Sequence, residues 1–235
     1  MRDQVTRDRG HAPVIIFDDA DVDVAAKTMA TSKFRNAGQV CVSPTRFLVQ
    51  EGIYKSFVDK FVDATKLLKV GNGLEASSTM GALANPRRTR AMEANVEDAK
   101  KHGAKVRTGG HRIGEEGNFY EPTVVTELSN DAQAMNVEPF GPLAVINPFK
   151  SFDDAVTEAN RLPFGLAAYA WTRSAKTANA IASSVEVGMI TINHLGLAIP
   201  EVPFGGVKDS GYGSEGGSEA IEAYLNPKFV SQAGL

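Results

Sequence analysis

The chain has 235 residues, of which 43% are hydrophobic and 23% are charged, and 25 Lys and Arg against 28 Asp and Glu give a net charge of −3. This length can bury one large core, and the composition excludes a disordered, collagen-like or coiled-coil chain. The slightly negative charge provides no field that attracts a phosphate backbone, so we do not expect a nucleic-acid partner.

Membrane insertion and disulfide bonding are also not expected. The sequence has no apolar run of about 18 residues, and its charged start, MRDQVTRDRG, is not followed by the apolar core of a signal peptide. A single cysteine cannot form an internal disulfide, which agrees with a reducing compartment. We therefore expect a soluble, cytoplasmic protein.

Strand and helix patterns alternate along the chain. The first strand is followed by a helix for which Asp21 is the expected N-cap, and Asn85 with Pro86 is the expected start of a later helix. Predicted strands cover residues 14–17, 46–50, 105–107, 123–125, 143–147, 166–171 and 189–193, and predicted helices cover 22–33, 53–69, 85–103, 152–160, 175–185 and 219–225. The alternation favours an α/β domain whose largely parallel sheet is flanked by helices. A short strand over 226–231, beginning beside a proline, predicts a sheet edge or an arm.

Cys41 lies in the connection between a predicted helix and the next strand. A free cysteine is most often a small buried hydrophobic residue, but the surroundings of Cys41 indicate a site. Gly38 permits a close approach of backbone to substrate, and Asn36 and Gln39 are uncharged hydrogen-bonding residues. A thiol with a pKa near 8.5 is a strong nucleophile toward a carbonyl once a base or dipole assists it.

Other motifs carry weaker signals. Residues 211–216 (GYGSEG) match G-x-G-x-x-G, but no predicted strand precedes them, so these glycines are expected to form turns. The histidines at 11, 102, 111 and 194 have no metal-ligand spacing, and we expect no metal site. The order of Cys41, Asn193 and His194 leaves a thiol hydrolase as an alternative, although the sequence typical of a protease cysteine is absent.

Three blocks together resemble the aldehyde dehydrogenase superfamily. They are residues 34–41 (FRNAGQVC), 138–142 (EPFGP) and 203–211 (PFGGVKDSG), with weaker matches at 10–14 (GHAPV) and Asn193. The resemblance implies that residues 10–225 form that family's catalytic domain. It further implies that residues 226–235 are an oligomerisation arm of a homo-oligomer, and that residues 1–9 are foreign to the family.

The resemblance also implies a mechanism. Cys41 would attack the aldehyde, the resulting thiohemiacetal would lose hydride to the nicotinamide of NAD or NADP, and the thioester would then be hydrolysed. Glu138 would bind the nicotinamide ribose, and Phe140 would lie beside the nicotinamide ring. Asn193 would lie near the aldehyde pocket.

A small acid semialdehyde is the leading substrate. Arg35 within FRNAGQVC resembles the arginine with which succinate-semialdehyde dehydrogenases hold the distal carboxylate, a use suited to a guanidinium fork. The pocket serine of those enzymes is replaced by Ala198, and their second cysteine by Ser43.

Family members are about twice as long, and their cofactor-binding half would precede residue 10. Arg7 stands where the family has its general-base glutamate, and a guanidinium cannot take a proton from water. We therefore expect the 235-residue chain to be inactive alone. A non-catalytic assembly module with the same fold is the alternative.

Overall fold

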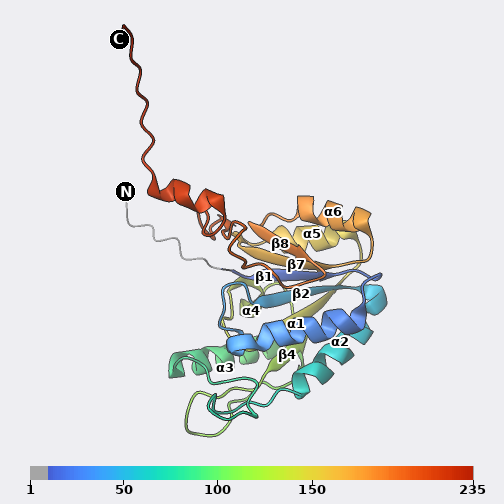
Figure 1. The fold of residues 1–235 in the computed structure, drawn as a ribbon. Helices are drawn as coiled ribbons and strands as arrows, with labels where there is room; N and C mark the ends of the chain where they lie inside the picture. The colour runs from blue at the N-terminus through green and yellow to red at the C-terminus, as the bar shows by residue number, and fades with distance from the viewer. Residues whose placement is uncertain (1–9, 235) are drawn as a thin grey trace.

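A seven-stranded sheet forms the centre of the computed structural model, which describes residues 10–234 (Figure 1). Its strands are β1 (Ala12–Ile16), β2 (Pro44–Gln50), β3 (Lys105–Thr108), β4 (Thr123–Thr126), β5 (Leu143–Phe149), β7 (Ala167–Trp171) and β8 (Met189–Ile192). They are ordered β3-β4-β5-β2-β1-β7-β8. Every neighbouring pair is parallel except β3 and β4. The short strands β6 (Phe164–Gly165) and β9 (Val207–Lys208) form a separate antiparallel pair.

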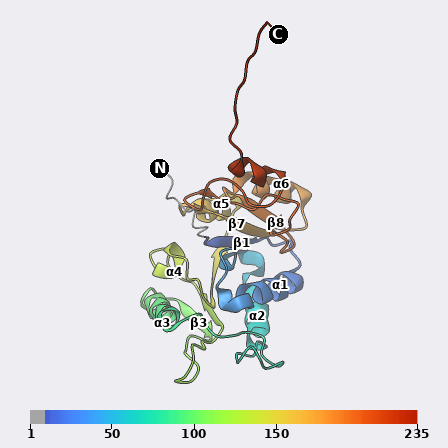
Figure 2. The ribbon, with the colours of Figure 1, turned by 60° about the vertical axis from the view of Figure 1, so that its left-hand side comes forward.

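Helices cover both faces of the sheet. They are α1 (Val22–Phe34), α2 (Glu51–Lys66), α3 (Pro86–Lys101), α4 (Gln133–Asn136), α5 (Phe152–Asn160) and α6 (Ala175–Ser184), with 3-10 helices η1 (Arg35–Gly38) and η2 (Ser218–Tyr224). Helices α1 and α2 lie on one face, and α5 and α6 lie on the other (Figures 1 and 2). Along β1, Val14 and Ile16 join the core beneath α1, whereas Ile15 joins the core beneath α5. No described helix has both the length and the apolar character needed to cross a bilayer.

The predicted fold class is confirmed, and so are the predicted starts of α1 and α3. The Asp21 carboxylate accepts a hydrogen bond from the Val24 amide at 3.2 Å, which caps α1. The Asn85 side chain accepts from the amides of Arg87 and Arg88 at 3.1 and 3.3 Å and so caps α3. These caps act between neighbours in sequence, which is why local patterns predict them.

The C-terminal segment differs from its sequence expectation. The predicted helix over 219–225 is the 3-10 helix η2, and residues 226–234 pair with no described strand. Instead they extend away from the rest of the chain (Figures 1 and 2). A strand exists only with a hydrogen-bonding neighbour, and one chain supplies none at this place. The oligomerisation strand therefore remains a prediction.

Parallel pairing brings distant segments together at one edge of the sheet. Ala12 of β1 pairs with Pro44 of β2, and Arg46 of β2 pairs with Val145 of β5. The segments that precede these three strands therefore meet at the amino edge of the sheet. Residues that follow β7 and β8 lie at the opposite, carboxyl edge.

Arg46 anchors the amino edge to α5 from a buried position. Its side chain is 2% exposed and forms a 2.9 Å ion pair with Glu158. It also donates to the carbonyls of His11 and Ala159 at 3.2 and 3.1 Å. Burial lowers the pKa of Arg46 to about 10, while the Glu158 charge opposes this shift, so the guanidinium stays charged at neutral pH.

Replacing Arg46 should destabilise the chain strongly. Arg46→Met leaves the buried carbonyls without donors and the Glu158 carboxylate with fewer partners. We expect a loss of about 3–5 kcal/mol in the free energy of unfolding, measured by urea denaturation. The matched control is Lys55→Met, which removes an exposed ion pair with Asp59 and should cost less than about 1 kcal/mol. Equal effects of the two substitutions would contradict this role for Arg46.

Candidate active site

A reversal of the chain after α1 presents Cys41. Asn36 and Ala37 have φ values of 50° and 52°, and Gly38 follows at 71°, so three successive left-handed residues turn the backbone toward β2. The Asn36 side chain donates to the Gln39 carbonyl at 3.0 Å, and the Gln39 side chain donates to the Asn36 carbonyl at 3.1 Å. These reciprocal bonds hold a turn that costs about 1–3 kcal/mol at each non-glycine residue, a strain that is typical of functional sites.

Residues 38–43, here called the Cys41 loop, are held from three sides. A Cβ on Gly10 would lie 2.1 Å from the Cys41 carbonyl oxygen, and one on Gly38 would lie 2.2 Å from the Gly141 carbonyl oxygen. The Tyr169 hydroxyl donates to the Val42 carbonyl at 2.7 Å. The Cys41 side chain itself is half-buried, so the thiol is neither sealed in the core nor on an open surface.

Residues 138–142, here called the Glu138 loop, precede β5 and lie beside the Cys41 loop. Glu138 is half-buried, and Phe140 is 36% exposed with a φ of 44°. The Arg88 side chain of α3 donates a hydrogen bond to the Pro139 carbonyl and so holds the Glu138 loop against α3. The structure thus brings the predicted residues Cys41, Glu138 and Phe140 to one edge of the sheet.

Two basic residues face Glu138. Lys33, at the end of α1, is fully buried, and its ammonium donates to the Ser43 hydroxyl at 3.3 Å. Burial lowers the pKa of Lys33 to about 7, and the charge of Glu138 opposes the shift. Burial also lowers the pKa of Arg88, again opposed by Glu138.

Lys33 was not among the residues singled out from the sequence. It lies three residues after Ala30 and seven after Ala26, so the three residues share one face of α1. All three positions are buried. A lysine on an apolar stripe is the signal that could have identified it.

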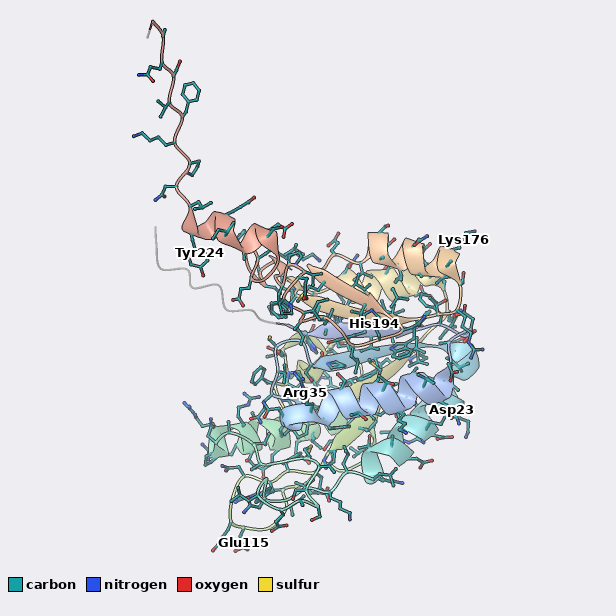
Figure 3. The ribbon with its side chains drawn as sticks, viewed as in Figure 1. Asp23, Arg35, Glu115, Lys176, His194 and Tyr224 are labelled. Atoms are coloured by element: carbon teal, nitrogen blue, oxygen red, sulfur yellow. The ribbon has the colours of Figure 1, made fainter. Side chains whose placement is uncertain are left out.

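Arg35 lies at the same edge with its side chain exposed at the end of α1 (Figure 3). Burial raises the pKa of Tyr169, the charge of Arg35 lowers it, and Cys41 raises it, so Arg35 and Cys41 both act electrostatically on Tyr169. Among residues 10–234, no carboxylate forms a salt bridge with Arg35. Its guanidinium can therefore bind an external anion.

Asn193 lies at the opposite, carboxyl edge, so the structure does not bring it together with Cys41, and its place near the aldehyde pocket stays a prediction. It follows β8, whose four residues at about 3.3 Å each separate it from the amino edge by about 13 Å. Its side-chain amide accepts from the Thr172 N–H at 3.0 Å and donates to the Thr172 carbonyl at 2.8 Å. Both polar groups of Asn193 thus join the ends of β7 and β8.

His194 is likewise unsuited to act with Cys41. It follows Asn193 beyond the carboxyl end of β8, and its Nδ1 accepts from the Gly196 amide at 3.0 Å. Cys41 precedes β2 at the opposite edge, so the paired thiol hydrolase is not supported.

The remaining sequence signals lie elsewhere. Residues 211–216 form a loop bridged to Phe204 through Glu215. The strand before it is the two-residue β9, which pairs antiparallel with β6 and is not part of the parallel sheet that a dinucleotide-binding unit requires. Ala198 is exposed, and Ser43 is buried against Lys33. Arg7 lies outside the described residues. Within 10–234, no three His, Cys, Asp or Glu residues are grouped as metal ligands.

The fold is therefore a largely parallel α/β domain with a thiol at the amino edge of its sheet. Residues 8–230 match the aldehyde dehydrogenase family. The chain belongs to this family.

Curated relatives extend over almost the whole chain. A putative 4-(hydroxymethyl)benzenesulfonate dehydrogenase of Comamonas testosteroni is 47% identical over 221 residues, covering 94% of this chain and 46% of the relative. A probable NADP(+) succinate-semialdehyde dehydrogenase of Sinorhizobium fredii is 43% identical, covering 96% and 46% respectively. A 3-sulfolactaldehyde dehydrogenase of Pseudomonas putida is 42% identical with the same coverage. The chain spans about half the length of these relatives.

Solved structures agree. Succinate-semialdehyde dehydrogenase from Burkholderia pseudomallei has a TM-score of 0.90 at 42% identity, covering 92% of this chain and 45% of that one. Betaine aldehyde dehydrogenase from Staphylococcus aureus, in complex with NAD+, has a TM-score of 0.88 at 33% identity, covering 94% and 46%.

The contact between the two loops should not tolerate a side chain at Gly38. Gly38→Ala would combine a left-handed backbone with a Cβ 2.2 Å from the Gly141 carbonyl oxygen. We expect a loss of at least about 1–3 kcal/mol in unfolding free energy. We also expect a changed rate of Cys41 alkylation by iodoacetamide.

The matched control is Gly81→Ala, since a Cβ there meets no atom within 4 Å. If Gly38→Ala matched this control in both stability and alkylation rate, the two loops would not be in the contact described above.

Proposed function

We propose that this chain is the catalytic part of an NAD(P)-dependent aldehyde dehydrogenase that oxidises a small aldehyde carrying a distal carboxylate or sulfonate. The observation that carries the proposal is the half-buried Cys41 thiol beside the loop of Glu138 and Phe140. Residues 10–225 are proposed as the catalytic domain and residues 226–235 as its oligomerisation arm.

The chemistry begins at the Cys41 sulfur. The thiolate attacks the carbonyl carbon, a C–S bond forms, and the carbonyl oxygen becomes an alkoxide that the Cys41 backbone N–H would help to stabilise. The carbon then loses a hydrogen with two electrons, which leaves a thioester. Water cleaves the C–S bond, so that the acid is released and the thiol is restored.

Glu138 and Phe140 suit a nicotinamide cofactor. The Glu138 carboxylate can accept hydrogen bonds from ribose hydroxyls, and the partly exposed Phe140 ring can cover one side of a flat base. When bound, NAD(P)+ supplies the acceptor for the hydride. The charge of Glu138 acts on two basic residues, Lys33 and Arg88, and raises the pKa of each against the effect of burial.

Arg35 is the residue proposed to bind the distal carboxylate or sulfonate of the substrate. Its exposed guanidinium acts electrostatically on Tyr169, whose hydroxyl binds the Val42 carbonyl next to Cys41. A planar guanidinium binds carboxylate and sulfonate oxygens in a bidentate manner. The names of three relatives refer to a benzenesulfonate, succinate semialdehyde and a sulfolactaldehyde, and each of these carries such an anion.

Protection of Cys41 tests this function without requiring turnover. We expect succinate semialdehyde to slow alkylation of Cys41 by iodoacetamide. Arg35→Gln should weaken that protection about 10–100-fold, corresponding to the loss of a charged hydrogen bond of about 1.5–3 kcal/mol. Protection by propanal, which lacks the distal anion, should be unchanged. Cys41→Ser is the control for site-specific labelling.

Two outcomes would count against the proposal. Equal loss of protection for both aldehydes would remove Arg35 as the anion reader. Because the chain spans about half the length of its relatives, we also propose that the 235 residues alone do not sustain turnover. Steady NAD(P)H formation by the pure chain would contradict that part.

We propose that the C-terminal arm mediates self-association of the chain. Self-association is expected both for the enzyme and for the alternative, a non-catalytic assembly module with the same fold. Leu225, directly before the arm, is 60% exposed, and Phe229 and Val230 within the arm are 92% and 69% exposed. Such a run of exposed apolar residues is unusual for a protein that remains monomeric. A second copy of the chain is the proposed partner for this arm.

Analytical ultracentrifugation tests the arm. We expect the 235-residue chain to sediment as a dimer or larger species at tens of micromolar. A variant ending at residue 224 should shift toward monomer, because it lacks the exposed apolar residues of the arm. A monomeric full chain would contradict the prediction. Cys41 alkylation no faster than that of a free thiol would favour the assembly module over the enzyme.

A further inference from the structure

We propose that Lys33 is a positioning residue whose buried ammonium holds the Cys41 loop and Glu138 in one arrangement. The inference rests on the proposed function, since it assigns to Lys33 the task of orienting the carboxylate that would receive the cofactor ribose. It concerns a residue outside the sequence blocks that resemble the family.

The contacts of Lys33 tie the end of α1 to the Cys41 loop. Its ammonium donates to the Ser43 hydroxyl at 3.3 Å, and that hydroxyl donates to the Lys33 carbonyl at 3.4 Å. Ser43 lies two residues after Cys41 and directly before β2. The position of the ammonium therefore determines where the loop enters the sheet.

The same ammonium lies where the two loops touch. A Cβ on Gly38 would meet the Gly141 carbonyl oxygen at 2.2 Å and the Lys33 Nζ at 3.2 Å. Glu138 lies three residues before Gly141, and its charge acts on Lys33. A cation at the junction of both loops is placed to orient a carboxylate on one and a thiol on the other.

Stability alone does not account for a charge at this position. Lys33 is 0% exposed, and burial lowers its pKa to about 7. In the unfolded chain Lys33 keeps its proton up to its ordinary pKa, near 10.4, whereas in the folded chain it loses the proton near pH 7. The charged form therefore destabilises the folded state, and the free energy of unfolding increases as the pH rises from about 7 to about 10.4. An apolar side chain of similar shape avoids this penalty.

Other charged groups surround Lys33 and bear on its pH dependence. Glu138 faces it from the Glu138 loop, and Arg88 of α3 faces Glu138. His11, before β1, feels the Lys33 charge, but burial and Arg46 already hold the His11 pKa well below its usual value. His11 therefore stays neutral, and Lys33 is the member of this set expected to change charge near neutral pH.

The test compares Lys33→Met, which keeps the length of the side chain without its charge, with Lys27→Met on the exposed face of α1. Amide hydrogen exchange is followed in peptides over 36–47 and 136–147, with α6 as internal reference. We expect Lys33→Met to raise exchange in both peptides about tenfold while the thermal midpoint at pH 7 is equal to or above that of the wild type. Lys27→Met should change neither.

A pH series separates the charge from packing. After correction for intrinsic rates, wild-type exchange in both peptides should rise between about pH 6 and 8, as Lys33 loses its proton. Lys33→Met should show no such step. Unchanged protection in Lys33→Met, or a step that survives in it, would overturn the proposal.

If Lys33→Met did not fold, Lys33 would be a residue needed for stability, and the proposal would be overturned. A second variant, Glu138→Gln, tests the same coupling from the other loop. Glu138→Gln should raise exchange in the Cys41 loop, and an unaffected Cys41 loop would also overturn it. Aldehyde protection of Cys41 is scored separately. If aldehydes did not protect Cys41 but Lys33→Met still raised exchange in both peptides, the proposed function would be refuted and the positioning role of Lys33 would stand.

Discussion

Parallel pairing of β1, β2 and β5 is the constraint on which the site depends. Strands that run the same way deliver their preceding segments to one edge, so Gly10, Cys41 and Glu138 converge although they are far apart in sequence. The two short glycine contacts then bring the backbones closer than any side chain would allow. Without this register, the thiol and the carboxylate would have no common location.

The location is unusual for a parallel α/β sheet. Ligands in open sheets usually bind beyond the carboxyl ends of strands, where loops before helices supply polar groups. In this chain, hydrogen bonds at the carboxyl edge join neighbouring strand ends to one another. Asp19 accepts from the Thr172 hydroxyl at 2.9 Å, and the Asn193 side chain binds the Thr172 backbone. At the amino edge, the left-handed turn after α1 leads the chain into the Cys41 loop, where Cys41 is half-buried just before β2.

Charge inside the domain serves two different ends. Arg46 is buried with its ion pair and carbonyl acceptors satisfied, and it joins β1, β2 and α5. Lys33 is buried with fewer partners, and its pKa near 7 reflects an ammonium that the fold holds at a penalty. Such an arrangement exchanges stability for a preorganised site, which is the usual relation between the two.

The sequence by itself determined the α/β class, the seven strands of the main sheet, the longer helices and the caps at Asp21 and Asn85, because these follow from apolar periodicity and contacts between near neighbours. It did not predict the short elements α4, β6, β9 and η1. It also indicated Cys41, Glu138, Phe140 and Arg35 through local blocks of residues. Only the tertiary structure decided which edge each residue occupies. Strand direction and order depend on long-range pairing, which places Asn193 at the far edge and buries Lys33, a residue that the sequence analysis did not single out, beside the Cys41 loop.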